Sequence, residues 1–197
     1  MISIEENDLT RGYAYDYYSV ESRPEGTSGR FDTTRTWAGS MVYQLKYAGI
    51  SITEKEELYS QIESKIAPEL LAANFDKPLA VLPAPSYLTD LSKNFHKVPY
   101  RLAKSIAEIL EVRWYPYFLV KNVDVESKTA KAGEEWDANA FTHPRQFQYP
   151  TNVLIVDDTY GEGRTLRACI RALRQDPNVN EIYFFSLARN RAGGLKS

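Results

Sequence analysis

The chain has 197 residues, of which 43% are hydrophobic and 25% charged, and its formal net charge is −2. This composition is typical of a globular domain, and the near-neutral charge provides no general attraction for nucleic acid or an anionic membrane. The single cysteine, Cys169, excludes an intrachain disulfide, and we see neither a secretory signal nor an apolar run long enough to span a membrane. We therefore expect a cytoplasmic protein that forms one domain over residues 1–197.

The first 75 residues are expected to form a hood or helical layer. Residues 1–32 look irregular, and their tyrosines suit an edge strand or a cap over the core better than base-stacking platforms; these are Tyr13, Tyr15, Tyr17 and Tyr18. Apolar residues at helical spacing predict helices over residues 33–47 and 51–73. Ser51 or Thr53 is a plausible N-cap of the second helix, and Pro68 is expected to kink or split it.

Residues 76–190 are expected to form an α/β core. Short apolar runs predict strands over residues 78–83, 115–120, 152–156 and 181–187. Helical spacing predicts helices over residues 99–112 and 165–174, and a long polar stretch at residues 121–150 is typical of a functional or mobile loop. This alternation predicts an open parallel sheet with helices on both faces.

The most informative segment is Val153–Thr165, with the sequence VLIVDDTYGEGRT. Ligands of open α/β sheets bind at the carboxyl ends of strands, where Asp157 and Asp158 would follow the apolar run. Gly161 and Gly163 allow a close turn, and a helix N-terminus after it presents N–H groups and partial positive charge. The two carboxylates would then accept hydrogen bonds from the hydroxyls of a sugar whose phosphate lies in the turn.

Other interpretations of this segment remain. Asp-Asp at a strand end also occurs in receiver domains, but a receiver would need roughly 100 more residues after this point, and only 39 follow Asp158. A Walker loop would require Gly-Lys-Ser/Thr, which is absent. A helix-capping turn with no ligand is the third alternative.

The segment resembles the phosphoribosyl-pyrophosphate (PRPP) signature of type I phosphoribosyltransferases. The resemblance implies that Asp157 and Asp158 hold the ribose hydroxyls and that the loop binds the 5-phosphate. The implied PRPP-binding residues of this segment are Asp157, Asp158, Thr159, Tyr160, Gly161, Glu162, Gly163, Arg164 and Thr165. Gly161 and Glu162 depart from the family pattern, and a Glu beside a phosphate is unfavourable unless it is paired, for example with Arg164 or Arg167.

Looser blocks resemble the ComF-like branch of this family, namely Gln44–Lys46, Leu82–Ser86, Asn94-Phe95, Leu102–Ala107, Asn139–Phe141 and Phe185–Arg189. The family likeness implies that Ala84, Pro85 and Ser86 lie near the pyrophosphate. It also places a mobile catalytic loop at residues 121–150, with Lys128 as a catalytic candidate beside Lys121 and Lys131. Lys93, Lys97 and Arg101 are further basic neighbours, although all these cations are also explained as ordinary surface charges.

These features predict a phosphoribosyltransferase that transfers the phosphoribosyl group of PRPP to an unidentified nitrogenous acceptor and releases pyrophosphate. Mg²⁺ would act through PRPP oxygens, with few direct protein ligands. Family analogy suggests a homodimer. The alternative is a non-catalytic protein of the same fold that binds PRPP or a nucleotide in regulation, or that assists DNA uptake.

Overall fold

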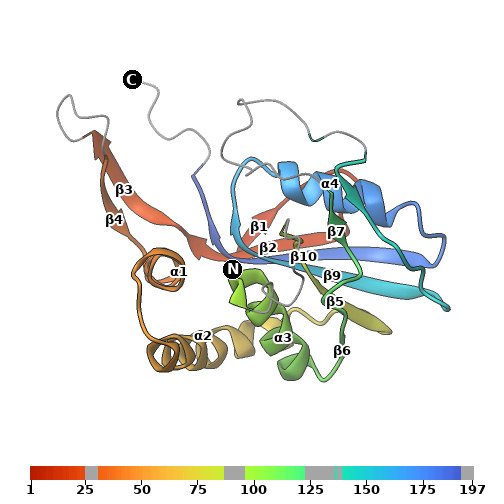
Figure 1. Cartoon of the computed structure of the whole chain (residues 1–197), viewed down its shortest axis with the longest axis horizontal. Coiled ribbons are helices and arrows are strands. Elements are labelled where there is room, and N and C mark those ends of the chain that lie inside the picture. The colour runs from red at the N-terminus through yellow and green to blue at the C-terminus, as the bar shows by residue number, and fades with distance from the viewer. Residues whose placement is uncertain (25–30, 87–95, 123–135, 137–138, 192–197) are drawn as a thin grey trace.

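A computed structural model describes residues 1–24, 31–86, 96–122, 136 and 139–191. Its centre is a six-stranded sheet in which neighbouring strands are parallel except at one edge, where the first strand is antiparallel to the second (Figure 1). In spatial order the strands are β1 (Ile2–Ile4), β2 (Arg11–Tyr17), β10 (Val179–Arg189), β9 (Thr151–Tyr160), β5 (Leu79–Pro83) and β6 (Arg113–Trp114). The predicted parallel sheet is therefore confirmed.

Helices cover both faces of this sheet, as the sequence predicts (Figure 1). One face packs against α1 (Trp37–Tyr47), α2 (Ile52–Ala72) and α3 (Val98–Leu110), and the other packs against α4 (Arg164–Leu173). Because side chains alternate along a strand, Leu154 and Val156 enter the first core whereas Val153 and Ile155 enter the second. All four side chains are fully buried, so β9 is a central strand of the fold.

Residues 1–75, which we expected to form a hood or helical layer, contain both helices and strands. Residues 37–72 supply the helical layer as α1 and α2, whereas the first residues of the chain join the sheet. β1 and β2 belong to the central sheet, and β2 lies between β1 and β10 rather than at an edge. Tyr13 and Tyr15 pack toward the α1–α3 core, while Ala14 between them enters the core on the α4 face. Side chains that alternate between the two faces are the pattern of a strand. We did not recognise it in the sequence because the surrounding residues are mostly polar.

A separate two-stranded hairpin follows β2. It consists of antiparallel β3 (Ser19–Pro24) and β4 (Phe31–Arg35) and projects from the body of the molecule beside α1 (Figure 1). The helix that we predicted from residue 33 therefore begins only at Trp37, where the Thr36 hydroxyl accepts a hydrogen bond from the Gly39 amide.

The second helix, α2, begins as predicted and does not break. Ser51 and Glu54 form a reciprocal capping box. The helix continues through Pro68 to Ala72, so the expected split does not occur. Because proline has no N–H, the Ser64 carbonyl loses the hydrogen bond that residue 68 would otherwise donate. Ser64 and Pro68 both lie on the exposed side of the helix, where water can replace that bond.

The predicted strand over residues 115–120 is wrong. β6 ends at Trp114, and a turn leads to β7 (Val120–Lys121), which pairs with β8 (Phe141–Thr142). Pro116 cannot donate to a strand ladder, and the Phe118 ring stacks on Phe147 with their centroids 4.1 Å apart. Aromatic packing therefore replaces strand pairing in this segment.

Among the described residues, no helix has the length and apolar character needed to cross a membrane.

Candidate functional site

The two carboxylates of the sugar-phosphate motif lie on the strand itself. The strand predicted over residues 152–156 is longer than expected, because β10 pairs with β9 as far as Arg189 and β9 continues to Tyr160. On the other side of β9, the ladder with β5 ends at Pro83 and Val156. Asp157 and Asp158 therefore extend past the end of one neighbouring strand, at the carboxyl edge of the sheet where ligands of such folds bind.

Asp157 and Asp158 belong to opposite faces of the sheet. Successive side chains of a strand alternate, so Asp158 shares the face of Leu154 and Val156, and Asp157 shares that of Val153 and Ile155. Asp158 contacts α1, whereas Asp157 lies close enough to Cys169 of α4 to affect it electrostatically. A sugar held by both carboxylates must therefore lie across the end of β9.

Lys46 holds Asp158. Its Nζ donates to Asp158 Oδ1 over 2.6 Å, and the side chains of Lys46 and Asp158 are 30% and 6% exposed. Burial lowers the pKa of Lys46, but the charges of Asp158 and Asp157 outweigh it and the net shift is upward. Lys46 appeared in the sequence only as part of a loosely similar block, and nothing in that block indicated a partner 112 residues away.

Asp157 lies in a different electrostatic environment. Burial raises the pKa of its carboxyl to about 7, and the neighbouring Asp158 charge adds to the rise. Two contacts oppose this rise in pKa. They are the charge of Lys46 and a 2.8 Å hydrogen bond that the Asp158 amide donates to Asp157 Oδ1. Asp157 therefore changes charge near neutral pH.

The glycine turn after β9 has the predicted form. Gly163 has a φ of +79° and precedes the first residue of α4, Arg164. A Cβ on Gly163 would lie 2.0 Å from Glu6 Oε1, so this position requires glycine for both conformation and space. The turn thus delivers the residues of the expected phosphate loop, Gly161–Thr165, to the N-terminus of α4, where an anion is favoured.

Glu6 braces this turn from the β1–β2 connection. Its Oε1 accepts hydrogen bonds from Tyr160 Oη at 2.6 Å and Arg167 Nη1 at 2.9 Å. Tyr160 ends β9 and Arg167 lies in the first turns of α4, so one carboxylate joins both sides of the loop. Sequence reasoning missed Glu6, because it lies 154 residues from Tyr160 and in no motif.

Glu162, the residue that departs from the family pattern, is paired. Its Oε2 lies 3.3 Å from Arg164 Nε, and the Glu162 side chain is 59% exposed. Arg167, the other cation that we considered as its partner, contacts Glu6 instead. The repulsion that Glu162 would exert on a phosphate is therefore partly neutralised within the loop.

The segment expected near pyrophosphate lies beside the carboxylates. The Ala84 amide donates to the Val156 carbonyl over 2.7 Å, which extends β5 along β9, and Ala84 and Pro85 are buried. The Ser86 amide donates to the hydroxyl of Tyr100, whose pKa is raised to about 12, chiefly by burial. Residues 84–86 thus lie at the same edge of the sheet as Asp157.

Two basic residues of our sequence analysis, Arg101 and Lys121, have partners of their own. Arg101 contacts Glu56 and Glu63 at 3.0 and 3.2 Å. Lys121 is buried, with its Nζ 4.5 Å from the centroid of the Trp136 ring. Lys97 is the N-cap residue of α3. Three further candidates, Lys93, Lys128 and Lys131, lie outside the described residues.

Cys169 and His143 lie in packed surroundings. Cys169 is fully buried, and burial raises the pKa of its thiol, which opposes formation of a thiolate nucleophile. The His143 ring stacks on Phe118. Within the described part of the chain, no three His, Cys, Asp or Glu side chains gather as a metal site.

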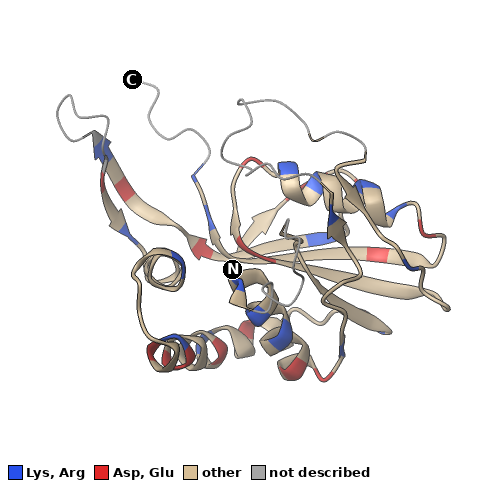
Figure 2. Ribbon diagram, viewed as in Figure 1, with Lys and Arg blue, Asp and Glu red and all other residues tan. Residues whose placement is uncertain are grey.

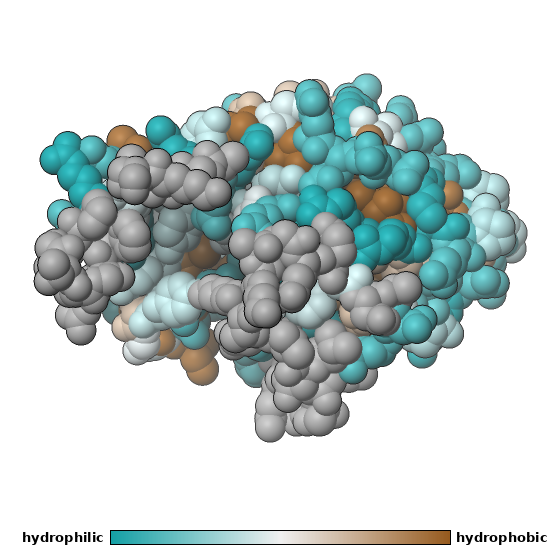
Figure 3. All heavy atoms as spheres, turned by 90° about the horizontal axis from the view of Figure 1, so that it is seen from above, coloured by the Kyte–Doolittle hydropathy of each residue, from teal (hydrophilic) through white to brown (hydrophobic). Residues whose placement is uncertain are grey.

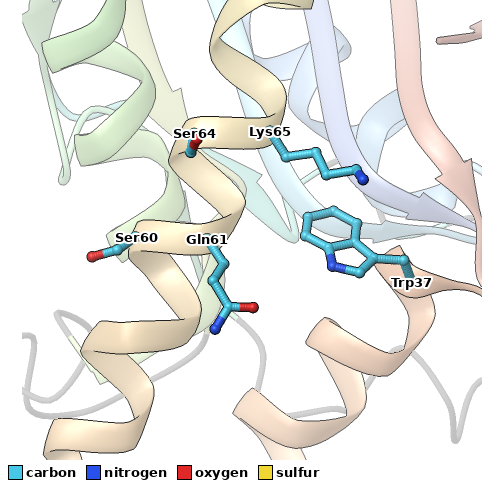
Figure 4. Close-up of a pocket in the computed structure, with 5 residues that line it drawn as sticks. All are labelled: Trp37, Ser60, Gln61, Ser64 and Lys65. Carbon is cyan, nitrogen blue, oxygen red and sulfur yellow. The ribbon is translucent and has the colours of Figure 1, made fainter.

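The surface carries mixed charge. Both acidic and basic residues are present on α2 and on α3 (Figure 2). Seen from the α4 side, the described surface is largely hydrophilic, and apolar residues show only in small areas (Figure 3). A shallow groove between α1 and α2 is lined by Trp37, Ser60, Gln61, Ser64 and Lys65, and contains neither carboxylate (Figure 4).

The comparisons with known proteins establish no family. No protein-family model matches the chain, and no curated protein matches it. Among solved structures, it is similar to a hypoxanthine phosphoribosyltransferase from Staphylococcus aureus, with 15% sequence identity and a TM-score of 0.40. The match covers 66% of this chain and 61% of that one, so the chain spans less than two thirds of its structural neighbour. The α/β fold assignment accordingly rests on the strand order and the helix layers described above.

Proposed function

We propose that this chain is a phosphoribosyltransferase, which binds PRPP at the end of β9 and transfers its phosphoribosyl group to a nitrogen nucleophile. The observation that carries the proposal is the junction of β9 and α4. Two carboxylates at the carboxyl edge of a parallel sheet are followed directly by a glycine turn and a helix N-terminus. This arrangement suits a sugar with vicinal hydroxyls on its ring and a phosphate on its exocyclic carbon.

In the proposed complex, the loop Gly161–Thr165 binds the 5-phosphate. The carboxylates of Asp157 and Asp158 accept hydrogen bonds from the ribose hydroxyls, and Thr159 and Tyr160 shape the loop between them. Ala84, Pro85 and Ser86 would lie beside the leaving pyrophosphate. Lys128, which is outside the described residues, stays the predicted group that neutralises it. Positioning and electrostatic stabilisation of a cation-like ribosyl group would supply most of the rate.

The described carboxylates fit a protein-held Mg²⁺ poorly. Asp157 and Asp158 extend from opposite faces of β9, and an ammonium group already occupies Asp158 Oδ1. A hard cation prefers several converging oxygens, which these two side chains do not provide. We therefore assign no step to a protein-bound ion, and the expected Mg²⁺ would arrive on the oxygens of PRPP.

Calorimetric titration with PRPP tests the proposal. Wild-type protein is expected to bind PRPP, and the Asp157→Asn/Asp158→Asn variant is expected to lose this binding. Asp76→Asn is a matched control, because Asp76 precedes β5 at the opposite edge of the sheet and accepts a hydrogen bond from Tyr183. Loss of binding in the control alone, or no binding of PRPP by wild-type protein, would contradict the proposal.

A second candidate is a protein that binds PRPP or a nucleotide without turnover, as in regulation or as an accessory of DNA uptake. The pairing of Arg101 with Glu56 and Glu63, and of Lys46 with Asp158, favours it, because these cations are already neutralised when a leaving group needs positive charge. Release of pyrophosphate from PRPP in the presence of a mixture of nucleobases separates the two. Turnover supports the enzyme, whereas binding without pyrophosphate supports the second candidate.

A further inference from the structure

The ion pair between Lys46 and Asp158 lies within the proposed sugar site. Lys46 is near the C-terminal end of α1, on the helical layer, and its Nζ lies 2.6 Å from Asp158 Oδ1. Asp157 is the next residue of β9 and also acts electrostatically on Lys46. The tertiary fold therefore brings one positive charge to two neighbouring carboxylates.

An ammonium group has three donors and no acceptor. One donor of Lys46 is used by Asp158, so the geometry leaves this group able to donate to a second oxygen as well. A ribose hydroxyl needs both an acceptor for its proton and a donor for its oxygen. The Lys46–Asp158 pair supplies both from a single point at the strand end.

The charge balance gives the pair a second consequence. Among the described residues, Lys46 is the cation paired with Asp158. Without its charge, a phosphorylated sugar would meet two carboxylates in a poorly solvated site, where like charges repel strongly. A divalent ion could offset that repulsion. The ammonium group of Lys46 already offsets this repulsion, and a short hydrogen bond to Asp158 holds it in place.

We propose that Lys46 is a built-in counter-cation of the sugar site, which binds the ribose diol together with Asp158 and makes binding of a ribose 5-phosphate group independent of a divalent cation. This inference rests on the proposed function. It assigns to a lysine ammonium the charge that a bound metal ion would otherwise supply at the sugar site. Lys46 is a ligand-binding residue in this proposal, and Mg²⁺ is confined to the pyrophosphate part of PRPP.

Ribose 5-phosphate is the direct probe, because it carries the diol and the 5-phosphate but no pyrophosphate. Its affinity is measured by calorimetry with excess Mg²⁺ and with a chelator. Wild-type protein is expected to give the same affinity in both, within about twofold. Lys46→Met is expected to lose about tenfold or more in chelator and to recover part of that loss with Mg²⁺, while Lys46→Arg keeps metal-independent binding.

Lys104→Met is the matched control. Lys104 also pairs with a carboxylate, Glu108 at 3.7 Å, but on the exposed side of α3. The Lys104→Met variant is expected to bind ribose 5-phosphate as tightly as wild-type protein, both with Mg²⁺ and with the chelator. A loss of affinity in this variant equal to that of Lys46→Met would overturn the assignment.

Lys46→Met can also weaken folding, since Asp158 is buried without its partner. The Lys46→Met/Asp158→Asn variant removes both charges, and its thermal midpoint is expected to return toward that of wild-type protein. If Lys46 is a ligand-binding residue, this folded variant still binds ribose 5-phosphate weakly and Mg²⁺ does not restore it. Wild-type affinity in the double variant would overturn the proposal.

The outcomes separate this inference from the proposed function. If wild-type protein and the Lys46 variants all bind ribose 5-phosphate only with Mg²⁺, the role of Lys46 is overturned and the proposed function still stands. Wild-type protein that binds neither ribose 5-phosphate nor PRPP overturns the function and this inference with it.

Discussion

Glu6 holds Arg167 at 2.9 Å, and the same carboxylate oxygen would lie 2.0 Å from a Cβ on Gly163. The glycine turn of the candidate phosphate loop is therefore packed against an anionic side chain from the far N-terminal end of the chain. This contact positions the loop from behind, since Tyr160 on one side and Arg167 on the other donate to Glu6.

Gly163→Ala is expected to destabilise the protein by about 2–4 kcal/mol, because a left-handed φ is strained for alanine and the new methyl meets Glu6. Gly49→Ala is the matched control, since Gly49 also has a positive φ but nothing lies within 4 Å of its added Cβ. That change should cost only about 1 kcal/mol. Urea unfolding measures both, and equal losses would show that Glu6 exerts no steric effect.

The pH dependence of stability should reveal Asp157. Its pKa is raised from 3.8 to about 7 in the folded protein, chiefly by burial, so the folded state binds more protons than the unfolded state between these values. The unfolding free energy contributed by this group is therefore highest below pH 4 and falls as the pH rises toward 7. Asp157→Asn should remove this fall and be more stable than wild-type protein at pH 8, by about 1 kcal/mol or more.

Urea titrations at several pH values measure this effect. Asp8→Asn is a suitable control, because Asp8 is exposed in a turn and its positive φ suits asparagine. The pH profile of that variant should follow wild-type protein. An unchanged profile in Asp157→Asn would mean that the carboxyl of Asp157 is not the group that titrates.

The local parts of this site could be predicted from the sequence, whereas its long-range contacts could not. Val153–Val156 is a continuous apolar run, and two glycines punctuate the turn after it, so strand, turn and helix follow from neighbouring residues. The strand nevertheless continues through both carboxylates, because β10 offers backbone partners as far as Arg189. No local pattern contains that information.

Lys46 and Glu6 show the same limit. Each contacts the motif across more than a hundred residues of chain, and each lies in a segment whose own pattern only indicates a helix or an irregular start. The place of β1 and β2 in the central sheet was not predicted, for a related reason. Tyr13 and Tyr15 alternate with small residues, as expected for a strand. The charged and hydroxyl side chains around them weaken this pattern, so the sequence did not indicate that β1 and β2 complete the sheet.

The Lys46–Asp158 pair also has a testable effect on folding. Lys46→Met leaves a carboxylate that is only 6% exposed without its ammonium partner, which should cost about 2 kcal/mol of unfolding free energy. Asp158→Asn in the same background should recover most of this loss, since no charge is then buried. A double-mutant cycle in urea measures the coupling, and additive losses would indicate that the pair does not stabilise the fold.

Glu162 is expected to weaken anion binding by holding Arg164. Glu162→Thr removes a negative charge from the candidate phosphate loop and releases Arg164 from a 3.3 Å contact, so the affinity for PRPP should rise by about three- to tenfold. Glu21→Thr removes an acid from a comparable exposed pair, Glu21 with Arg23 at 2.6 Å, on the β3–β4 hairpin. Its PRPP affinity should equal that of wild-type protein in the same calorimetric titration. Weaker binding by Glu162→Thr would instead show that the Glu162–Arg164 contact organises the loop, and the departure from the family pattern would then be part of a working site.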